Sequence, residues 1–179
     1  MSSPIEEEPR IGTVILGIGS NDGDRVRQIE RALGQLIMHL NLERISSIYE
    51  SEPMELRDQP WFLNLVCMGT TRLKPWDLLE FLHTVEDKLG RKRGGERFGP
   101  RTIDIDILAY DERVMEEADL EIPHPRMGER AFVLQPLAEI APEWQHPVTG
   151  QTADEMLAQA DAEVIRPYMV PPPPAAPVL

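Results

Sequence analysis

Two carboxylates stand two residues apart in the segment 102–108, which reads TIDIDIL. Because side chains alternate between the two faces of a strand, the three isoleucines share one face and Asp104 and Asp106 share the other. Like charges held side by side repel and therefore favour a bound cation, and Mg²⁺ typically binds through one or two carboxylates together with substrate phosphates. Taken alone, this short segment fits a solvated strand face equally well.

The segment before this strand, residues 91–101, places five of the chain's 18 basic residues within eleven positions. Planar guanidinium groups match phosphate oxygens through paired hydrogen bonds, and Gly94, Gly95 and Gly99 give the loop freedom to close over a polyphosphate. The alternative is a solvated basic loop beside an acidic surface. The neighbouring carboxylate pair favours a local anion site.

An aromatic side chain and an amide lie close together on a third segment. Phe62 and Asn64 fall on the same face of an expected strand over 61–72, a pairing that suits a flat heterocycle with hydrogen-bonding edges. Ordinary strand packing is the commoner explanation of such a pair alone. His124, between two prolines, suits either phosphate binding or a turn cap, and a zinc site is not expected because no second His or Cys stands at ligand spacing.

The glycine turn over 17–21, GIGSN, lies between an apolar run and a helical pattern and invites comparison with nucleotide-binding loops. Position 22 is Asp where the dinucleotide pattern requires glycine, and no Gly-Lys-Ser/Thr follows. The Rossmann and P-loop patterns are therefore both excluded. A glycine turn at a helix start can still approach a ligand closely, although a plain tight turn fits these residues as well.

Hydrophobic spacing predicts the elements that position these residues. Short apolar or alternating runs predict strands, and apolar residues three or four apart predict helices. The expected order is a strand over 13–18, a helix over 26–40, strands over 42–49 and 61–72, a helix over 75–90, a strand over 102–110 and a helix over 132–140. This β-α-β-β-α-β order predicts an α+β fold of the ferredoxin-like kind, an antiparallel sheet with helices packed on it.

Length and charge limit the possible functions. A chain of 179 residues is expected to form a single domain, and a net charge of −13 argues against nucleic acid and anionic membranes as partners. We expect a disordered N-terminus over 1–10, a folded domain over 11–165 and a proline-rich tail over 166–179. With no signal or membrane-spanning pattern, the chain is expected to be cytoplasmic, with its one cysteine, Cys67, buried.

Four segments together resemble one known family. GIGSN at 17–21, SEPMELRDQPWFLN at 51–64, RFGPRTIDIDIL at 97–108 and IPHPRMGERAFVLQPLAEIAP at 122–142 are similar, in this order, to the 6-hydroxymethyl-7,8-dihydropterin pyrophosphokinases of folate synthesis. The resemblance covers nearly the whole expected domain. It implies an ATP- and Mg²⁺-dependent diphosphokinase that transfers the β,γ-diphosphate of ATP to the pterin hydroxymethyl group and releases AMP.

The resemblance also implies roles for individual residues. Asp104 and Asp106 would hold two Mg²⁺ ions that bridge the ATP phosphates. The residues on the ATP side would be the phosphate-binding Arg91, Arg93 and Arg101, with His124, Arg130 and the adenine contact Ile107. Those on the pterin side would be the two stacking rings Phe62 and Phe132, with Ser51, Met54 and Asn64 beside them. The loops over 50–60 and 91–101 would be mobile lids, and the protein a monomer.

Three positions depart from the family pattern. Glu52 stands where many members have an apolar residue or proline, Phe98 replaces a frequent tryptophan, and Pro125 replaces a tyrosine found in some members. The first departure weakens the expected pterin contacts and the second lessens stacking by the loop over 91–101. None of the three removes an expected metal ligand.

Two other functions use some of the same features. A nucleotidyltransferase also combines a Gly-Ser turn with an Asp-x-Asp pair, but it places the pair shortly after the turn, whereas 85 positions separate Gly19 from Asp104. A non-catalytic ferredoxin-like ligand sensor would account for the fold and the aromatic pair. It leaves the adjoining acidic and arginine clusters unexplained.

Overall fold

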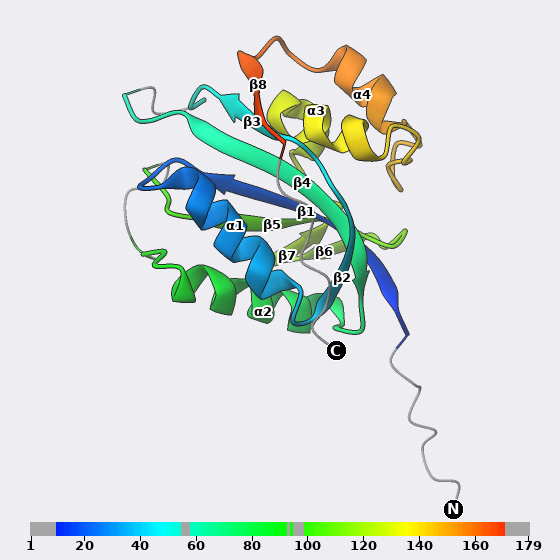
Figure 1. Ribbon diagram of the computed structural model, residues 1–179. Helices are drawn as coiled ribbons and strands as arrows, with labels where there is room; N and C mark the ends of the chain where they lie inside the picture. Colours follow the sequence, from blue (N-terminus) through cyan, green and yellow to red (C-terminus); the bar gives the residue numbers. More distant parts are fainter. Residues whose placement is uncertain (1–9, 55–57, 93, 95–98, 171–179) are drawn as a thin grey trace, which may run out of the picture.

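The computed structural model describes residues 10–54, 58–92, 94 and 99–170 of the chain (Figure 1). The elements before the carboxylate pair are β1 (Gly12–Ser20), α1 (Arg25–Leu36), β2 (Leu40–Ile45), β3 (Ile48–Ser51), β4 (Phe62–Thr71) and α2 (Pro75–Lys88). Those that follow are β5 (Asp104–Tyr110), β6 (Met115–Glu117), β7 (Leu120–Ile122), the 3-10 turn Met127–Glu129, α3 (Ala131–Ile140), α4 (Ala153–Gln159) and β8 (Ile165–Met169).

The main sheet has the strand order β5-β1-β4-β3-β8, with β2 pairing beside β3 along the same strand β4. Each of these pairings is antiparallel. The expected ferredoxin-like fold in a single domain is therefore confirmed, with β2 and β3 together in the place of one expected strand of the β-α-β-β-α-β order. A separate hairpin, β6-β7, adjoins the main sheet through β7, which contacts β5.

Helices cover both faces of the main sheet (Figure 1). On one face, α1 and α2 bury residues such as Ile29, Leu82 and Val85 against the apolar side of β1 and β5. On the other face, α3 and α4 pack through a smaller core that includes Val66, Leu137 and Ala153. The smaller core does not fill this second face, and the residues expected to be functional gather beside it.

The single strand expected over 42–49 is in fact two strands, β2 and β3, separated at Ser46 and Ser47. The backbone N–H of Ser46 donates to the carbonyl of Val66, while the Ser46 hydroxyl accepts the N–H of Val66 at 3.0 Å. A side-chain oxygen thus takes the place of a backbone carbonyl in the ladder, which interrupts the strand. Apolar alternation alone does not reveal such a substitution.

The C-terminal part of the chain returns to the sheet as β8, which pairs antiparallel with β3. Residues 166–169, assigned from the sequence to the proline-rich tail, thus belong to a strand that begins one residue earlier. Residues 171–179 of that expected tail and residues 1–9 of the expected disordered N-terminus lie outside the described residues. Among the helices that the structure describes, none has the length and apolar character needed to span a membrane.

Candidate active site

Two cavities meet at the carboxylate pair of β5. The first lies between the sheet and α3, and the second lies between β5, α2 and the segment 119–125. Both are lined by Arg101, Asp104 and Asp106. The first also receives five side chains expected to contact pterin and one expected to contact ATP: Ser51, Met54, Phe62, Asn64, Phe132 and Arg130. The second also receives Arg91, Ile107 and His124.

Arg93 lies outside the described residues, as does Phe98, one of the three departures from the family pattern. The other two departures line the cavities, Glu52 the first and Pro125 the second. Apart from Arg93, each residue that the sequence singled out as a site residue therefore lines one of the two adjoining cavities.

Strand alternation places the two carboxylates as expected, with Ile105 and Ile107 buried in the core on the α1/α2 side. Asp104 accepts one hydrogen bond from Arg91 Nη1 at 2.7 Å and another from Arg101 Nη1 at 2.7 Å. Two guanidinium groups thus neutralise the negative charge of one carboxylate. Such charge-assisted bonds are stronger than neutral ones, so they fix both arginines against the end of β5.

Asp106 has the opposite environment. The pKa of Asp106 is raised to about 7, chiefly by burial and then by the negative charges of Asp104 and Glu86, against the opposing effects of Arg130 and Arg101. A carboxylate with a pKa this high carries uncompensated negative charge when it ionises. Binding of a cation at the pair would relieve that cost.

Glu86 is a third acidic residue at the site, and it was missed in the sequence analysis. It lies on α2 with 1% of its surface exposed, and its Oε1 accepts hydrogen bonds from Ile105 N at 2.8 Å and from Arg91 Nη1. Its carboxylate therefore fixes Arg91 and the start of β5 at once. An acidic residue on the helix face that also carries Leu82 and Val85 is the signal that could have identified it.

The aromatic end of the first cavity is built on the pairing of β1, β4 and β3. Asn64 lies opposite Gly19 on β1, and its Nδ2 donates to Ser51 Oγ on β3 at 2.8 Å. A Cβ atom at Gly19 would lie 3.2 Å from Asn64 Oδ1 and 3.9 Å from Phe62 Cδ1. Glycine at this position thus leaves room for the amide beside the ring, as a close backbone approach requires.

Phe132 belongs to the first turn of α3, and its backbone N–H donates to Glu163 Oε2 at 3.2 Å. The guanidinium of Arg130 lies 5.6 Å from the centre of the Phe132 ring. Phe62 comes from β4 in the sheet, whereas Phe132 comes from a helix that covers it. The first cavity therefore has aromatic side chains from both of the layers that enclose it.

His124 closes the second cavity after the cis peptide bond between Ile122 and Pro123. Its backbone N–H donates to the carbonyl of Leu108, and its Nδ1 accepts the N–H of Arg126 at 3.2 Å. Burial lowers the pKa of His124, and the charge of Arg130 lowers it further, so the neutral imidazole is favoured. With Nδ1 accepting, Nε2 is the nitrogen that carries the proton.

Asn21 is a further polar residue near the site whose role the sequence analysis did not assign. Asn21 is fully buried, donates through Nδ2 to Gln59 Oε1 and Pro60 O, and accepts the N–H of Arg101 at 2.8 Å. It therefore links Arg101 to the segment before Phe62. The GIGSN turn contained this residue, but its long-range partners were not visible in the sequence.

The donor chemistry of the carboxylate pair fits Mg²⁺. In the part of the chain that the structure describes, no group of three or more His, Cys, Asp or Glu side chains is arranged to hold a metal ion. A site of two carboxylates completed by substrate phosphates and water is the usual pattern for Mg²⁺, which seldom relies on an all-protein cage. A cation beside Asp104 and Asp106 would offset the mutual repulsion of the two carboxylates.

Comparison with known proteins agrees with this geometry. Residues 15–142 match the family model of 7,8-dihydro-6-hydroxymethylpterin-pyrophosphokinase. The 2-amino-4-hydroxy-6-hydroxymethyldihydropteridine pyrophosphokinase of Bacillus subtilis is 42% identical over 142 residues, which cover 78% of this chain and 84% of that protein. The folic acid synthesis protein FOL1 of Dictyostelium discoideum is 42% identical over 164 residues, or 91% of this chain, but the chain spans only 24% of that longer protein.

The fold has counterparts among solved structures. The Plasmodium falciparum HPPK-DHPS wild-type structure with pterin and p-hydroxybenzoate superposes with a TM-score of 0.69 at 18% identity, over 87% of this chain and 42% of that one. At this identity the similarity concerns the fold alone. Because the family model covers most of the chain and the Bacillus relative matches over most of its own length, the chain belongs to the 7,8-dihydro-6-hydroxymethylpterin-pyrophosphokinase family.

Proposed function

We propose that this chain transfers the β,γ-diphosphate of ATP to the hydroxymethyl group of 6-hydroxymethyl-7,8-dihydropterin and releases AMP, a step of folate synthesis. The observation that carries the proposal is that two cavities of different chemistry share Arg101, Asp104 and Asp106. The first cavity offers two aromatic rings and an amide beside its arginines. The second offers Arg91, two histidines and further acidic side chains, and it has no aromatic ring of Phe, Tyr or Trp among the described residues that line it. A transfer between two substrates requires such a common boundary.

The carboxylate pair is the proposed holder of two Mg²⁺ ions. Bound Mg²⁺ would neutralise developing charge on the transferred group and align the oxygens of the phosphates. The role of the chain itself is to present Asp104 and Asp106 side by side, with Asp106 poorly solvated and near other acids. Family membership supports the use of ATP as the co-substrate.

Arg91 and Arg101 are the proposed phosphate-stabilising groups. In the reaction, the hydroxymethyl oxygen forms a bond to the β-phosphorus, its proton is released, and the bond between the β-phosphorus and the bridging oxygen to the α-phosphorus breaks. The bridging oxygen leaves with AMP. Both guanidinium groups lie at the boundary of the cavities, where they can donate to phosphate oxygens as charge moves along this line.

The aromatic end of the first cavity is the proposed pterin site. Phe62 and Phe132 supply ring faces for stacking, Met54 adds apolar surface, and the amide of Asn64, held by Ser51, pairs with the heterocycle's edge. The second cavity is the proposed ATP side, where Ile107 contacts the adenine and His124 donates from Nε2. Arg130 lines the first cavity, and its proposed role is to reach the phosphates from there, across the shared carboxylates. The proposed oligomeric state is a monomer.

A product analysis tests the proposal. The purified chain would be incubated with ATP, Mg²⁺ and 6-hydroxymethyl-7,8-dihydropterin, and the nucleotides and pterins would be separated and weighed by mass spectrometry. The expected result is AMP and a pterin carrying two phosphates in equal amounts. ADP would indicate a simple kinase, pyrophosphate with a pterin-AMP adduct would indicate a nucleotidyltransferase, and binding without any product would indicate a ligand sensor.

A further inference from the structure

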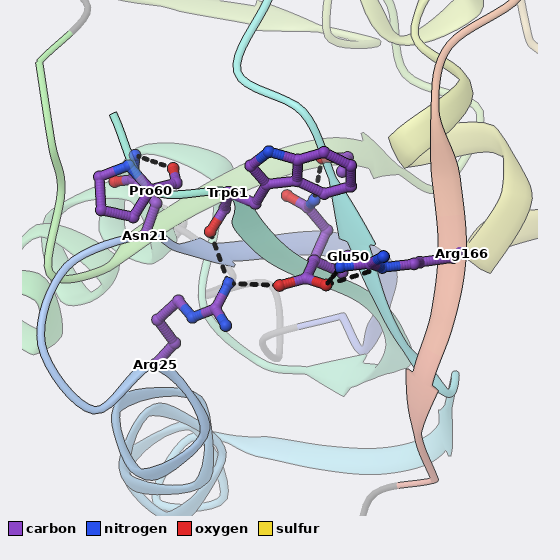
Figure 2. Close-up of polar contacts among 8 residues, drawn as sticks. Asn21, Arg25, Glu50, Pro60, Trp61 and Arg166 are labelled. Atoms are coloured by element: carbon purple, nitrogen blue, oxygen red, sulfur yellow. Dashed lines mark hydrogen bonds and ion pairs between the residues drawn. The ribbon is translucent and has the colours of Figure 1, made fainter. Parts of the chain in front are cut away.

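Glu50 is a carboxylate with only 7% of its surface exposed, held by two arginines from distant parts of the chain (Figure 2). Arg25, at the start of α1, donates through Nη1 to Glu50 Oε1 at 2.9 Å. Arg166, on β8, donates through Nε at 2.9 Å and Nη2 at 2.6 Å to Oε2. Burial acts to raise the pKa of Glu50, but the two arginines outweigh it and the net pKa is lowered. Glu50 therefore stays ionised.

The same two arginines also hold Trp61. Arg25 Nη1 donates to the carbonyl oxygen of Trp61 at 2.6 Å, and the guanidinium of Arg166 lies 4.7 Å from the centre of its indole ring. Each arginine therefore joins the chain just before Ser51 to the chain just before Phe62 (Figure 2). We call the four residues Arg25, Glu50, Trp61 and Arg166 the Glu50 clamp.

The Glu50 clamp lies directly behind the proposed pterin site. Ser51 and Phe62 are register partners across β3 and β4, and both line the first cavity. Glu50 and Trp61 are their immediate neighbours in the chain. No member of the clamp is among the described residues that line the cavity, so the clamp acts on the ligand only through the positions of Ser51 and Phe62.

The Glu50 clamp is expected to contribute more to the positions of Ser51 and Phe62 than to the folding stability of the chain. The side chain of Arg166 is 62% exposed, and ion pairs this open to solvent contribute little to folding. The pair nevertheless has two hydrogen bonds to one carboxylate oxygen and a stacking contact, which together restrict the rotation and tilt of the groups. Small displacements of binding groups reduce affinity, even where the fold survives.

We propose that Arg166 is a positioning residue for the pterin end of the site: acting through Glu50 and Trp61, the C-terminal strand sets the affinity for the heterocycle without touching it. This inference rests on the proposed function. It gives β8 a role in substrate binding although the strand lies outside the residues 15–142 that match the family model.

Separate binding titrations with 6-hydroxymethyl-7,8-dihydropterin and with ATP test the proposal, alongside kcat and KM for each. Arg166→Ala is expected to weaken pterin binding about fivefold, the upper range for an exposed ion pair. Its ATP affinity and kcat should stay within about twofold of wild type on the same scale. Arg166→Lys keeps the charge but not the two-atom contact, so it should restore part of the pterin affinity.

Glu139→Gln is the matched control. The Glu139 carboxylate accepts hydrogen bonds from Ser47 and Tyr49 around the same strand β3, and none of the hydrogen bonds described for it involves the clamp. The Glu139→Gln variant should have a lower melting temperature than wild type and an unchanged affinity for the pterin. Unchanged pterin affinity in Arg166→Ala, or an equal loss for both ligands, would overturn the positioning role. A wild-type chain that binds ATP but no pterin would overturn the proposed function itself, and the positioning role with it.

Discussion

The carboxylate end and the aromatic end of the proposed active site are held in place by different kinds of neighbours. Around Asp104, the groups proposed to touch phosphate also hold one another, since Arg91 and Arg101 both donate to its oxygens. Around Phe62, the fixing groups are Asn21 and the Glu50 clamp, which lie at the back of the cavity wall. At the carboxylate end, the arginine side chains are thus held by a carboxylate that is itself part of the site, with Glu86 as a further partner of Arg91. At the aromatic end, the binding groups are held from behind the cavity wall.

This difference indicates how each end should respond to change. At the carboxylate end, a phosphate must replace Asp104 as the partner of arginines that are already paired, so these arginines contribute little net binding energy. Mutations there should therefore act mainly on turnover. The aromatic end presents fixed surfaces, so mutations there should act mainly on the affinity for one substrate. The variants below test this contrast from the largest expected effect to the smallest.

Asp106→Asn should lower kcat about a thousandfold, which corresponds to about 4 kcal/mol of transition-state stabilisation lost with a charged metal ligand. The fold should survive, because the change removes a poorly solvated charge near Asp104 and Glu86. Steady-state kinetics at saturating Mg²⁺ and a thermal melt would measure both effects. Near-wild-type turnover in a folded variant would instead support a solvated strand face.

Arg101→Ala should lower kcat about a hundredfold, the scale seen when one charge-stabilising donor is removed. ATP affinity should fall less than about tenfold, because the wild-type guanidinium exchanges one anionic partner, Asp104, for another on binding. Arg44→Ala is the control, since this exposed arginine donates only to the carbonyl of Ile140 among the bonds described. A loss confined to ATP affinity would make Arg101 a simple binding group.

Phe62→Ala should weaken pterin binding about tenfold through lost stacking and apolar contact, and leave ATP affinity nearly unchanged. Isothermal titrations with each ligand separately would measure both values. If ATP affinity falls and pterin affinity does not, the aromatic end has been assigned to the wrong substrate.

Gly19→Ala should have the smallest effect, a loss of pterin affinity of about fivefold from about 1 kcal/mol of overpacking. Its new Cβ would lie 3.2 Å from Asn64 Oδ1, so the amide must shift by a few tenths of an ångström. Gly34→Ala, where nothing lies within 4 Å of the added Cβ, is the control for the glycine replacement. Equal pterin affinity for the two variants would show that the Asn64 amide can shift without loss of binding. Its hydrogen bond to Ser51 would then not fix its position.

Local pattern was enough to predict several features of the fold. The faces of β5 followed from alternation, and the bounds of α2 followed from Pro75 at its start and Gly90 just past its end, where φ is +89°. Each of these depends on neighbours in the sequence. The ferredoxin-like fold class then followed from the succession of strands and helices.

Features set by distant partners could not be predicted in this way. The break at Ser46 depends on Val66, the strand β8 depends on β3, and the burial of Glu50 depends on arginines 25 residues before it and 116 residues after it. Charged and polar residues at such positions fit a solvated surface when only the sequence is considered. The spacing of residues in the sequence likewise could not predict that the two cavities adjoin each other at Arg101, Asp104 and Asp106.

Labelled ATP provides the most direct test of the central claim, that the two cavities together carry out diphosphate transfer. Parallel reactions with 6-hydroxymethyl-7,8-dihydropterin would use ATP carrying radioactive phosphorus at the α, β or γ position, and the pterin and nucleotide products would be counted after separation. The account predicts that the β and γ labels both appear in the pterin product and that the α label stays in AMP. Transfer of the γ label alone, or of the α label to the pterin, would contradict it.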